Sequence, residues 1–301
     1  MLQKITPNLW FDGNAREAAE FYVSVFPGSK IAGGSKYPES KEEGLADFQL
    51  DLAGKDLTVD FNLAGHDFVG INAGPEFKPT PALSFMVNFD PSHDDQAKEH
   101  LDEVWGKLLD GGEALMELGE YPFSKWYGWV KDRYGFTWQL MLTNPDGEER
   151  PCIIPNLMFA NDNANKAEEA IDFYLSVFKD SKIGTVARYE QDQEPVKAGG
   201  IMFADFNLAG EWFAAMDAPG THEFGFNEAV SLSVVCKDQA EIDDLWSKLS
   251  AVPESEQCGW CKDKYGVSWQ IVPENMAELM NKPDAFAKMM QMHKIVIADF
   301  N

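Results

Sequence analysis

The chain has few basic residues, few cysteines and few histidines. Lys and Arg number 25 against 50 Asp and Glu, and the formal net charge is −25. Such a charge disfavours nucleic acid and anionic membranes, because binding to either depends on Lys and Arg. No apolar run approaches the roughly 20 residues that cross a bilayer, and the N-terminus has no signal-peptide core. We therefore expect a cytoplasmic protein with no nucleic-acid or membrane partner and with its cysteines as thiols.

Two of the four cysteines, Cys258 and Cys261, form a C-x-x-C pair, a spacing that redox and zinc sites use. No second pair and no His pair stands near it to complete a zinc site. The first half of the chain has Tyr127 and Val130 at the matching positions, so the spacing is not part of a repeated design. We interpret the pair as two ordinary thiols, with a redox or zinc site as the alternative.

The chain repeats itself with a period close to 150 residues. The segment GWVKDRYGFTWQ at 128–139 returns as GWCKDKYGVSWQ at 259–270, with identity at eight of 12 positions. Other segments recur in the same order: 7–11 as 155–159, 21–26 as 173–178, 29–31 as 181–183, and 61–65 as 206–210. This period is far above that of a solenoid. The sequence predicts two tandem domains, 1–147 and 150–275, followed by a helical tail over 276–301.

Each half contains two copies of one pattern, in which a strand is followed by a helix and then by further strands. In the first half we predict helices at 15–26 and 96–109 and strands at 5–11, 30–37, 45–52, 57–63, 82–89, 126–131 and 137–142. In the second half we predict helices at 166–178 and 239–249, and in the tail a helix over 275–292. The fold class is α+β: paired βαβββ units form a curved, mixed or antiparallel sheet in each half. Its concave face is a natural place for a small molecule.

Several motifs together carry a family likeness. They are ITPNLWFDGN at 5–14, EAAEFY at 17–22, FPGSKI at 26–31, YPFS at 121–124, YGW at 127–129, and the segments 135–139, 257–273 and 289–298. With them the chain resembles the vicinal oxygen chelate (glyoxalase/bleomycin-resistance/dioxygenase) superfamily. Within it, the chain is similar to the PhnB-like branch, often labelled demethylubiquinone methyltransferase-like. The resemblance implies the glyoxalase/bleomycin-resistance fold, and an internal pseudo-dimer or a homodimer.

The resemblance also implies a divalent metal that chelates two neighbouring substrate oxygens. Its ligand positions fall on the following residues: Thr6 or Ile154, Ser84 or Ser231, Gln139 or Gln270, and the region of Asn72 or Asp217. None is a histidine, and this donor set is weak for a transition metal. We expect no metal cofactor, and keep a metal-dependent lyase, isomerase or dioxygenase as the alternative, together with a scaffold in which neither concavity works.

Other catalytic motifs are missing as well. The sequence has no G-x-G-x-x-G after a strand, which argues against a methyl-donor site of the Rossmann type. It has no G-x-S-x-G for a nucleophilic serine. Whether the protein is an enzyme stays open at this stage.

The remaining hypothesis is a concave pocket that binds a small apolar or aromatic molecule. The expected lining residues are Asn8, Trp10, Asn72, Ser84, Trp126, Tyr127, Trp129 and Gln139 in the first half, and Asp217, Ser231, Trp260 and Gln270 in the second. Trp138 and Trp269 are expected in the core. We further expect segment 117–126 to be a loop that covers the first pocket, which would make the first half the better binding site. The alternative is that this loop only caps the helix of the first domain.

Overall fold

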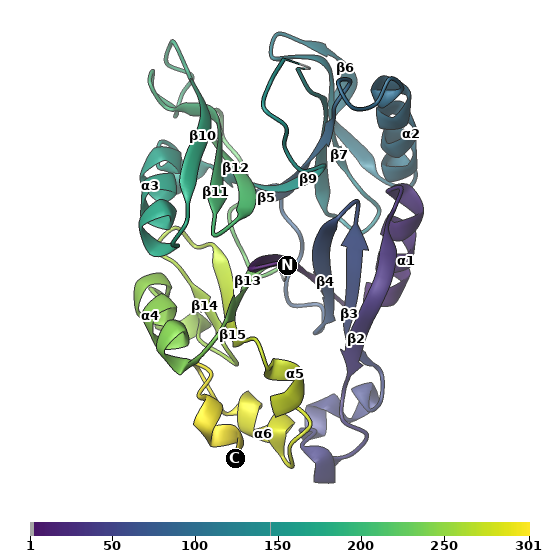
Figure 1. The fold of residues 1–301 in the computed structure, drawn as a ribbon, viewed down its shortest axis with the longest axis vertical. Coiled ribbons are helices and arrows are strands. Elements are labelled where there is room, and N and C mark those ends of the chain that lie inside the picture. Colours follow the sequence, from purple (N-terminus) through teal and green to yellow (C-terminus); the bar gives the residue numbers. More distant parts are fainter. Residues whose placement is uncertain (1–2, 145) are drawn as a thin grey trace.

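The computed structural model describes residues 3–144 and 146–301. Its elements form four successive units, two in each half (Figure 1). The first contains β1 (Ile5–Phe11), α1 (Ala15–Val25), β2 (Lys30–Lys36), β3 (Asp56–Leu63) and β4 (His66–Asn72). The second contains β5 (Leu83–Phe89), α2 (Ala97–Leu109), β6 (Glu113–Tyr121), β7 (Ser124–Lys131) and β8 (Thr137–Leu142).

The second half repeats this order with one strand fewer. The third unit contains β9 (Ile153–Phe159), α3 (Ala167–Val177), β10 (Lys182–Arg188), β11 (Ile201–Leu208) and β12 (Glu211–Asp217). The fourth contains β13 (Val230–Cys236), α4 (Gln239–Leu249), β14 (Trp260–Lys262) and β15 (Ser268–Pro273). The tail adds α5 (Met276–Leu279) and α6 (Ala285–Met290).

The strands form two curved mixed sheets, which confirms the predicted fold class. Sheet A has seven strands in the order β14-β15-β13-β1-β4-β3-β2, and sheet B has eight in the order β10-β11-β12-β9-β5-β8-β7-β6. Each sheet bends into two arms, with helices on the outer faces and a concave face between the arms (Figure 1).

The structure differs from the expectation in which units share a sheet. We expected the two units of one half to pair, but the first unit pairs with the fourth and the second with the third. The contacts between halves are antiparallel: Asn8 of β1 lies opposite Ser231 of β13, and Ser84 of β5 lies opposite Asn156 of β9. Because β1 and β9 are near copies, local patterns do not distinguish pairing within a half from pairing between halves.

The repeated turn motif explains the two core tryptophans. Trp138 and Trp269 are completely buried, as predicted, and their indole N–H groups donate to the carboxylates of Asp132 and Asp263 at 2.8 and 2.9 Å. Each of these carboxylates also accepts two backbone N–H groups of its own turn and the hydroxyl of a helix tyrosine. In both copies the aspartate therefore links the hairpin to the helix on the outer face of the sheet.

Three local predictions are wrong. Residues 45–52 form no strand: Asp47–Leu52 is a 3-10 helix that follows a shorter one at Lys41–Glu43, and Gly44 between the two adopts a left-handed φ of 107°. The tail is not one helix: α5 and α6 are separated at Pro283, whose ring cannot continue a helix. Segment 117–126 is not a loop, because β6 and β7 extend through it and pair from Tyr121 to Ser124.

No helix within the described residues is long and apolar enough to span a membrane.

Gly128 allows β7 to approach α2 closely. A Cβ at this position would lie 2.5 Å from the ring of Trp105. We expect Gly128→Ala to lower the free energy of unfolding by about 1–3 kcal/mol, because the rigid indole has to move away together with its helix. Urea unfolding measures the change. Gly119→Ala on the adjacent strand is the matched control, since its Cβ would meet no atom within 4 Å; equal losses for both variants would contradict the packing argument.

Candidate functional site

The concave face of sheet B carries a buried series of hydrogen-bonded side chains, which we call the polar row. The Tyr127 hydroxyl donates to Gln139 Oε1 at 2.8 Å, and Gln139 Nε2 donates to Ser84 Oγ at 3.0 Å. Asn156 Nδ2 donates to the same Ser84 Oγ at 3.1 Å. All four side chains are at most 5% exposed. The row therefore joins β7, β8 and β5 of the first half to β9 of the second.

The polar row and its surroundings leave some hydrogen-bonding capacity unused. Asn156 Oδ1, Trp129 Nε1 and Thr137 Oγ1 are buried and have no partner among the described residues. By strand alternation, Trp129 and Thr137 lie on the same faces of β7 and β8 as Tyr127 and Gln139. Leaving a buried polar atom unpaired costs about 1–3 kcal/mol. These three atoms are enclosed as well as unpaired, so a group that enters beside one of them would supply the missing hydrogen bond.

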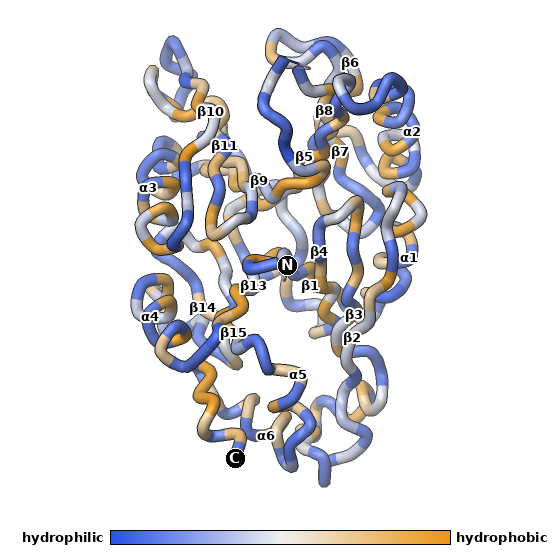
Figure 2. The backbone as a smooth tube through the Cα atoms, viewed as in Figure 1, coloured by the Kyte–Doolittle hydropathy of each residue, from blue (hydrophilic) through white to orange (hydrophobic). Residues whose placement is uncertain are grey.

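Apolar side chains flank the polar row on both sides. One cluster contains Met86, Ile154, Ala214, Met141, Phe203 and Trp212, and the other contains Met158, Ala160, Ala218, Trp129, Met216 and Phe224. Figure 2 shows the hydrophobic base of sheet B, where β5 and β9 lie side by side. Four of these side chains are methionines, which adapt their shape more readily than branched residues. Burial raises the pKa of Tyr127 far above its ordinary value, which keeps its hydroxyl neutral.

Sheet A contains a shorter version of the same arrangement. Gln270 Nε2 donates to Ser231 Oγ at 2.9 Å, but the opposing Asn8 donates to its own strand, at the carbonyl of Thr6. Trp260 lies opposite Gln270, and its ring packs edge-on against Trp10 at 5.8 Å. Five of the predicted lining residues are therefore gathered on sheet A, namely Asn8, Trp10, Ser231, Trp260 and Gln270.

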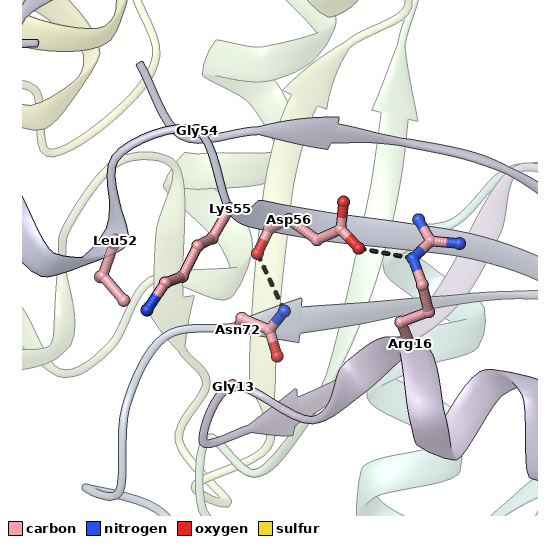
Figure 3. A pocket seen from close by; sticks show the side chains of 7 residues that line it. All are labelled: Gly13, Arg16, Leu52, Gly54, Lys55, Asp56 and Asn72. Carbon is pink, nitrogen blue, oxygen red and sulfur yellow. Dashed lines mark hydrogen bonds and ion pairs between the residues drawn. The ribbon is translucent and has the colours of Figure 1, made fainter. Parts of the chain in front are cut away.

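Two predicted lining residues instead face the helices. Asn72 Oδ1 accepts from the backbone N–H of Ala15 at 3.0 Å, and Asp217 Oδ1 accepts from that of Ala167 at 3.1 Å. Both side chains thus satisfy a free N–H at the start of a helix. On its outer side Asn72 lines a surface hollow of about 360 Å³ beside the Arg16–Asp56 ion pair (Figure 3). This hollow lies away from the polar row, and neither Asn72 nor Asp217 takes part in that row.

Trp126 is also placed differently from the expectation. Its indole N–H donates to Asp102 of α2 at 2.6 Å, and the ammonium of Lys98 lies 3.9 Å from its ring centroid. Because side chains alternate along a strand, Tyr127 faces the concave side and Trp126 faces the helix. Trp126 therefore packs against the outer helix and does not line the concavity.

Asn156 was missed among the predicted residues. The repeat contained the signal, since Pro155-Asn156-Leu157 copies Pro7-Asn8-Leu9. Pairing of the two units within one half would instead place Asn8 near Ser84. In the structure the partner of Ser84 is the copy in the other half.

The donor set does not fit the metal that the fold family implies. Ile154 is apolar and lies in the first cluster, while Gln139 and Ser84 are engaged with each other. Asn72 and Asp217 hold helix ends on the opposite face. Within the described residues no three His, Cys, Asp or Glu side chains are grouped so as to hold a metal ion. We derive no chemistry through a metal at this site.

The C-x-x-C pair consists of two free thiols in different surroundings. Cys261 is buried in the main core, and burial raises its pKa to about 12. Cys258 is partly buried, and its Sγ lies 3.7 Å from Met290 Sδ in the tail. Raised pKa values suppress the thiolate that redox chemistry and zinc binding require.

Comparison with known proteins decides the family. The family described as 3-demethylubiquinone-9 3-methyltransferase matches residues 3–141 and again residues 151–272. The chain belongs to this family, in two copies. A PhnB protein from Bacillus cereus is 39% identical over 47% of this chain and 100% of its own, with a TM-score of 0.39. The family match over both copies confirms the predicted resemblance to the PhnB-like branch.

One more distant structure shows the fold over both copies. Glyoxalase I from Zea mays is 10% identical over 92% of this chain and 96% of its own, with a TM-score of 0.52. A protein from Pseudomonas aeruginosa is 22% identical over 47% of this chain and 98% of its own, with a TM-score of 0.38. No curated protein matches the chain. The likeness to glyoxalase I concerns the fold alone.

Proposed function

We propose that this two-copy PhnB-like protein binds a small, neutral, apolar or aromatic molecule on the concave face of sheet B, without a tightly held metal. The observation that carries the proposal is the polar row, which ends at the unpartnered Asn156 Oδ1 between two apolar clusters. Binding sites commonly combine apolar walls with a few placed polar groups. The proposed ligand donates a hydrogen bond to Asn156 Oδ1 and accepts one from Trp129 Nε1, as the hydroxyl of an aromatic alcohol can do.

Electrostatics supports a neutral ligand. Every member of the polar row is uncharged, and the chain has a formal net charge of −25. An anionic ligand would meet this overall negative charge and would lose its hydration without gaining a cationic partner in the row. A hydroxylated aromatic molecule meets neither obstacle.

Methyl transfer is not part of this proposal, although the family description contains that activity. The described strands form two mixed sheets, and neither is a doubly wound parallel sheet with a glycine-rich turn of the kind that holds a nucleotide-type methyl donor. A metal-dependent reaction is not proposed either, because the concave face lacks suitable ligands.

A thermal-shift screen of neutral hydroxylated aromatics, with 1-naphthol as the first probe, tests binding. A ligand present at 100 times its dissociation constant stabilises the folded state by about 2.7 kcal/mol. We expect Asn156→Leu to weaken 1-naphthol binding by about tenfold or more, because one hydrogen bond in an apolar site is lost. Trp129→Phe should weaken it similarly, since it removes the indole N–H and keeps an aromatic ring. Isothermal titration calorimetry gives the dissociation constants.

Asn8→Leu is the matched control, because Asn8 occupies the same position in sheet A. It should leave the affinity of sheet B unchanged. Circular dichroism establishes that each variant is folded. Equal loss of affinity in the Asn8 and Asn156 variants, or no loss in either, would contradict the assignment to sheet B.

A further inference from the structure

Sheet A contains the framework of a second binding site. Asn8 lies opposite Ser231, as the corresponding pair does in sheet B, and Gln270 donates to Ser231 in the same way. Trp260 lies opposite Gln270 and packs against Trp10. Ser268 Oγ on this sheet is buried and has no partner among the described residues. The concave face of sheet A therefore keeps neutral polar groups beside aromatic walls.

The C-terminal tail lies against the turn that leads into β14. Within the described residues the fourth unit has no strand equivalent to β6. The outer edge of β14 is paired within its own unit, where the Ala251 N–H donates to the carbonyl of Lys262 and Gln257 pairs with Trp260. The backbone N–H of Cys258 donates to the carbonyl of Met292 at 2.8 Å, and that of Gly259 donates to the carbonyl of His293 at 2.7 Å. A Cβ at Gly259 would lie 3.0 Å from Ile295 Cγ1. The tail is thus held against one arm of sheet A.

The same tail also contacts the other arm. Phe286 of α6 is buried against Leu45 and Tyr37, and the centroids of the Phe286 and Tyr37 rings are 6.0 Å apart. Gly44 approaches α6 so closely that a Cβ there would lie 2.9 Å from the backbone nitrogen of Ala287. Figure 1 shows α5 and α6 between the lower ends of the two arms of sheet A, whereas no helix lies between the arms of sheet B at its opposite end.

We propose that residues 276–301 close a latent ligand site on the concave face of sheet A. The chain then binds one molecule in sheet B, and binds a second of the same neutral aromatic class only when the tail is displaced. The ligand class rests on the proposed function, whereas the closure by the tail rests on the contacts above. Because α6 meets the first unit through few side chains, a single substitution there can displace it while Met292 and His293 stay paired.

Phe286→Asp in the full-length chain displaces α6, because a carboxylate is not stable between Tyr37 and Leu45. The first readout needs no ligand. Cys258, whose sulfur is covered by Met290, should react with Ellman's reagent at least tenfold faster in this variant than in the wild type. Adding Cys258→Ser should remove the increase. Phe48→Asp is the matched control, because Phe48 on the neighbouring 3-10 helix is 81% exposed, and it should leave the reaction rate unchanged.

The second readout is the number of 1-naphthol molecules bound, measured by calorimetry. We expect one equivalent for the wild type and two for Phe286→Asp, with the second lost when Asn8→Leu is added. Ala287→Arg serves as a second displacing variant, because it crowds Gly44 without removing a core side chain. Two equivalents of 1-naphthol bound to the wild type would overturn the proposal. It would also be overturned if Cys258 became reactive in a displacing variant while no second 1-naphthol was bound, or if Cys258 stayed protected in both folded variants. If 1-naphthol bound only to the displacing variants, and Asn8→Leu removed that binding, the closure of sheet A by the tail would be supported. The proposed site in sheet B would then be contradicted.

Discussion

Asp132→Ala and Asp263→Ala should each lower the free energy of unfolding by about 3–5 kcal/mol, the largest stability effects expected in this protein. Asp132 Oδ2 accepts from Tyr22 and Trp138, both at 2.8 Å. Its Oδ1 accepts from the backbone N–H groups of Tyr134 and Phe136 at 2.8 and 3.1 Å. The carboxylate is only 3% exposed, so its removal leaves four donors without a partner and creates a cavity.

The second copy provides an internal check. Asp263 is completely buried and accepts from Tyr174, Trp269 and two backbone N–H groups at 2.7–3.1 Å. The two alanine variants should therefore lose similar amounts of stability. The Asp132→Asn variant should lose less, because the amide keeps one acceptor oxygen. Urea unfolding measures all of these changes.

Asp110→Ala is the control for a change of charge near the same turn. Asp110 pairs with Arg133 on the surface, and such exposed pairs contribute only about 0–1 kcal/mol. A loss below about 1 kcal/mol for both Asp132→Ala and Asp263→Ala would show that the turns do not depend on these carboxylates.

His66 should make the stability of the protein fall between pH 6.5 and pH 4. Burial lowers the pKa of His66 to about 4, against a smaller opposing effect of the neighbouring Asp67 carboxylate. The ordinary value in an unfolded chain is about 6.5. Between these two values the unfolded chain binds a proton at this position and the folded chain does not, so stability is lost as the pH falls. The loss attributable to His66 reaches about 3 kcal/mol at pH 4.

The measurement compares the wild type with His66→Gln over this pH range. The difference in free energy of unfolding between the two proteins should change by about 3 kcal/mol from pH 7 to pH 4, in favour of the variant at low pH. The carboxylates that titrate in both proteins cancel in this difference. His93→Gln is the control, because the His93 side chain is 62% exposed. A His66 variant that follows the wild type in parallel at every pH would show that the buried imidazole is not linked to unfolding.

Much of this fold could be read from the sequence because its signals are local. The copy of 128–139 at 259–270 established the duplication, and the periodic apolar positions placed all four long helices. The core position of Trp138 and Trp269 also followed, since a large apolar side chain in a central strand gains most by burial. The family match over both copies agrees with the repeated motifs.

The candidate site was only partly predictable. Ser84, Tyr127, Trp129 and Gln139 lie on one concave face, because side chains two residues apart on a strand share a face, and their role in binding stays a prediction. Strand alternation does not say which of the two faces meets the helices. For this reason Trp126, Asn72 and Asp217 were placed in the pocket, whereas their hydrogen bonds hold α2, α1 and α3.

The sequence by itself determined that this chain contains four related units with a common core and a common set of polar residues. Only the tertiary structure decided that units of different halves share a sheet, which places Asn156 beside Ser84 and Asn8 beside Ser231. It also decided that the tail is held against the turn that leads into β14. The pairing of the units depends on contacts between distant and nearly identical strand edges, and local sequence preference is the same for each of the competing partners.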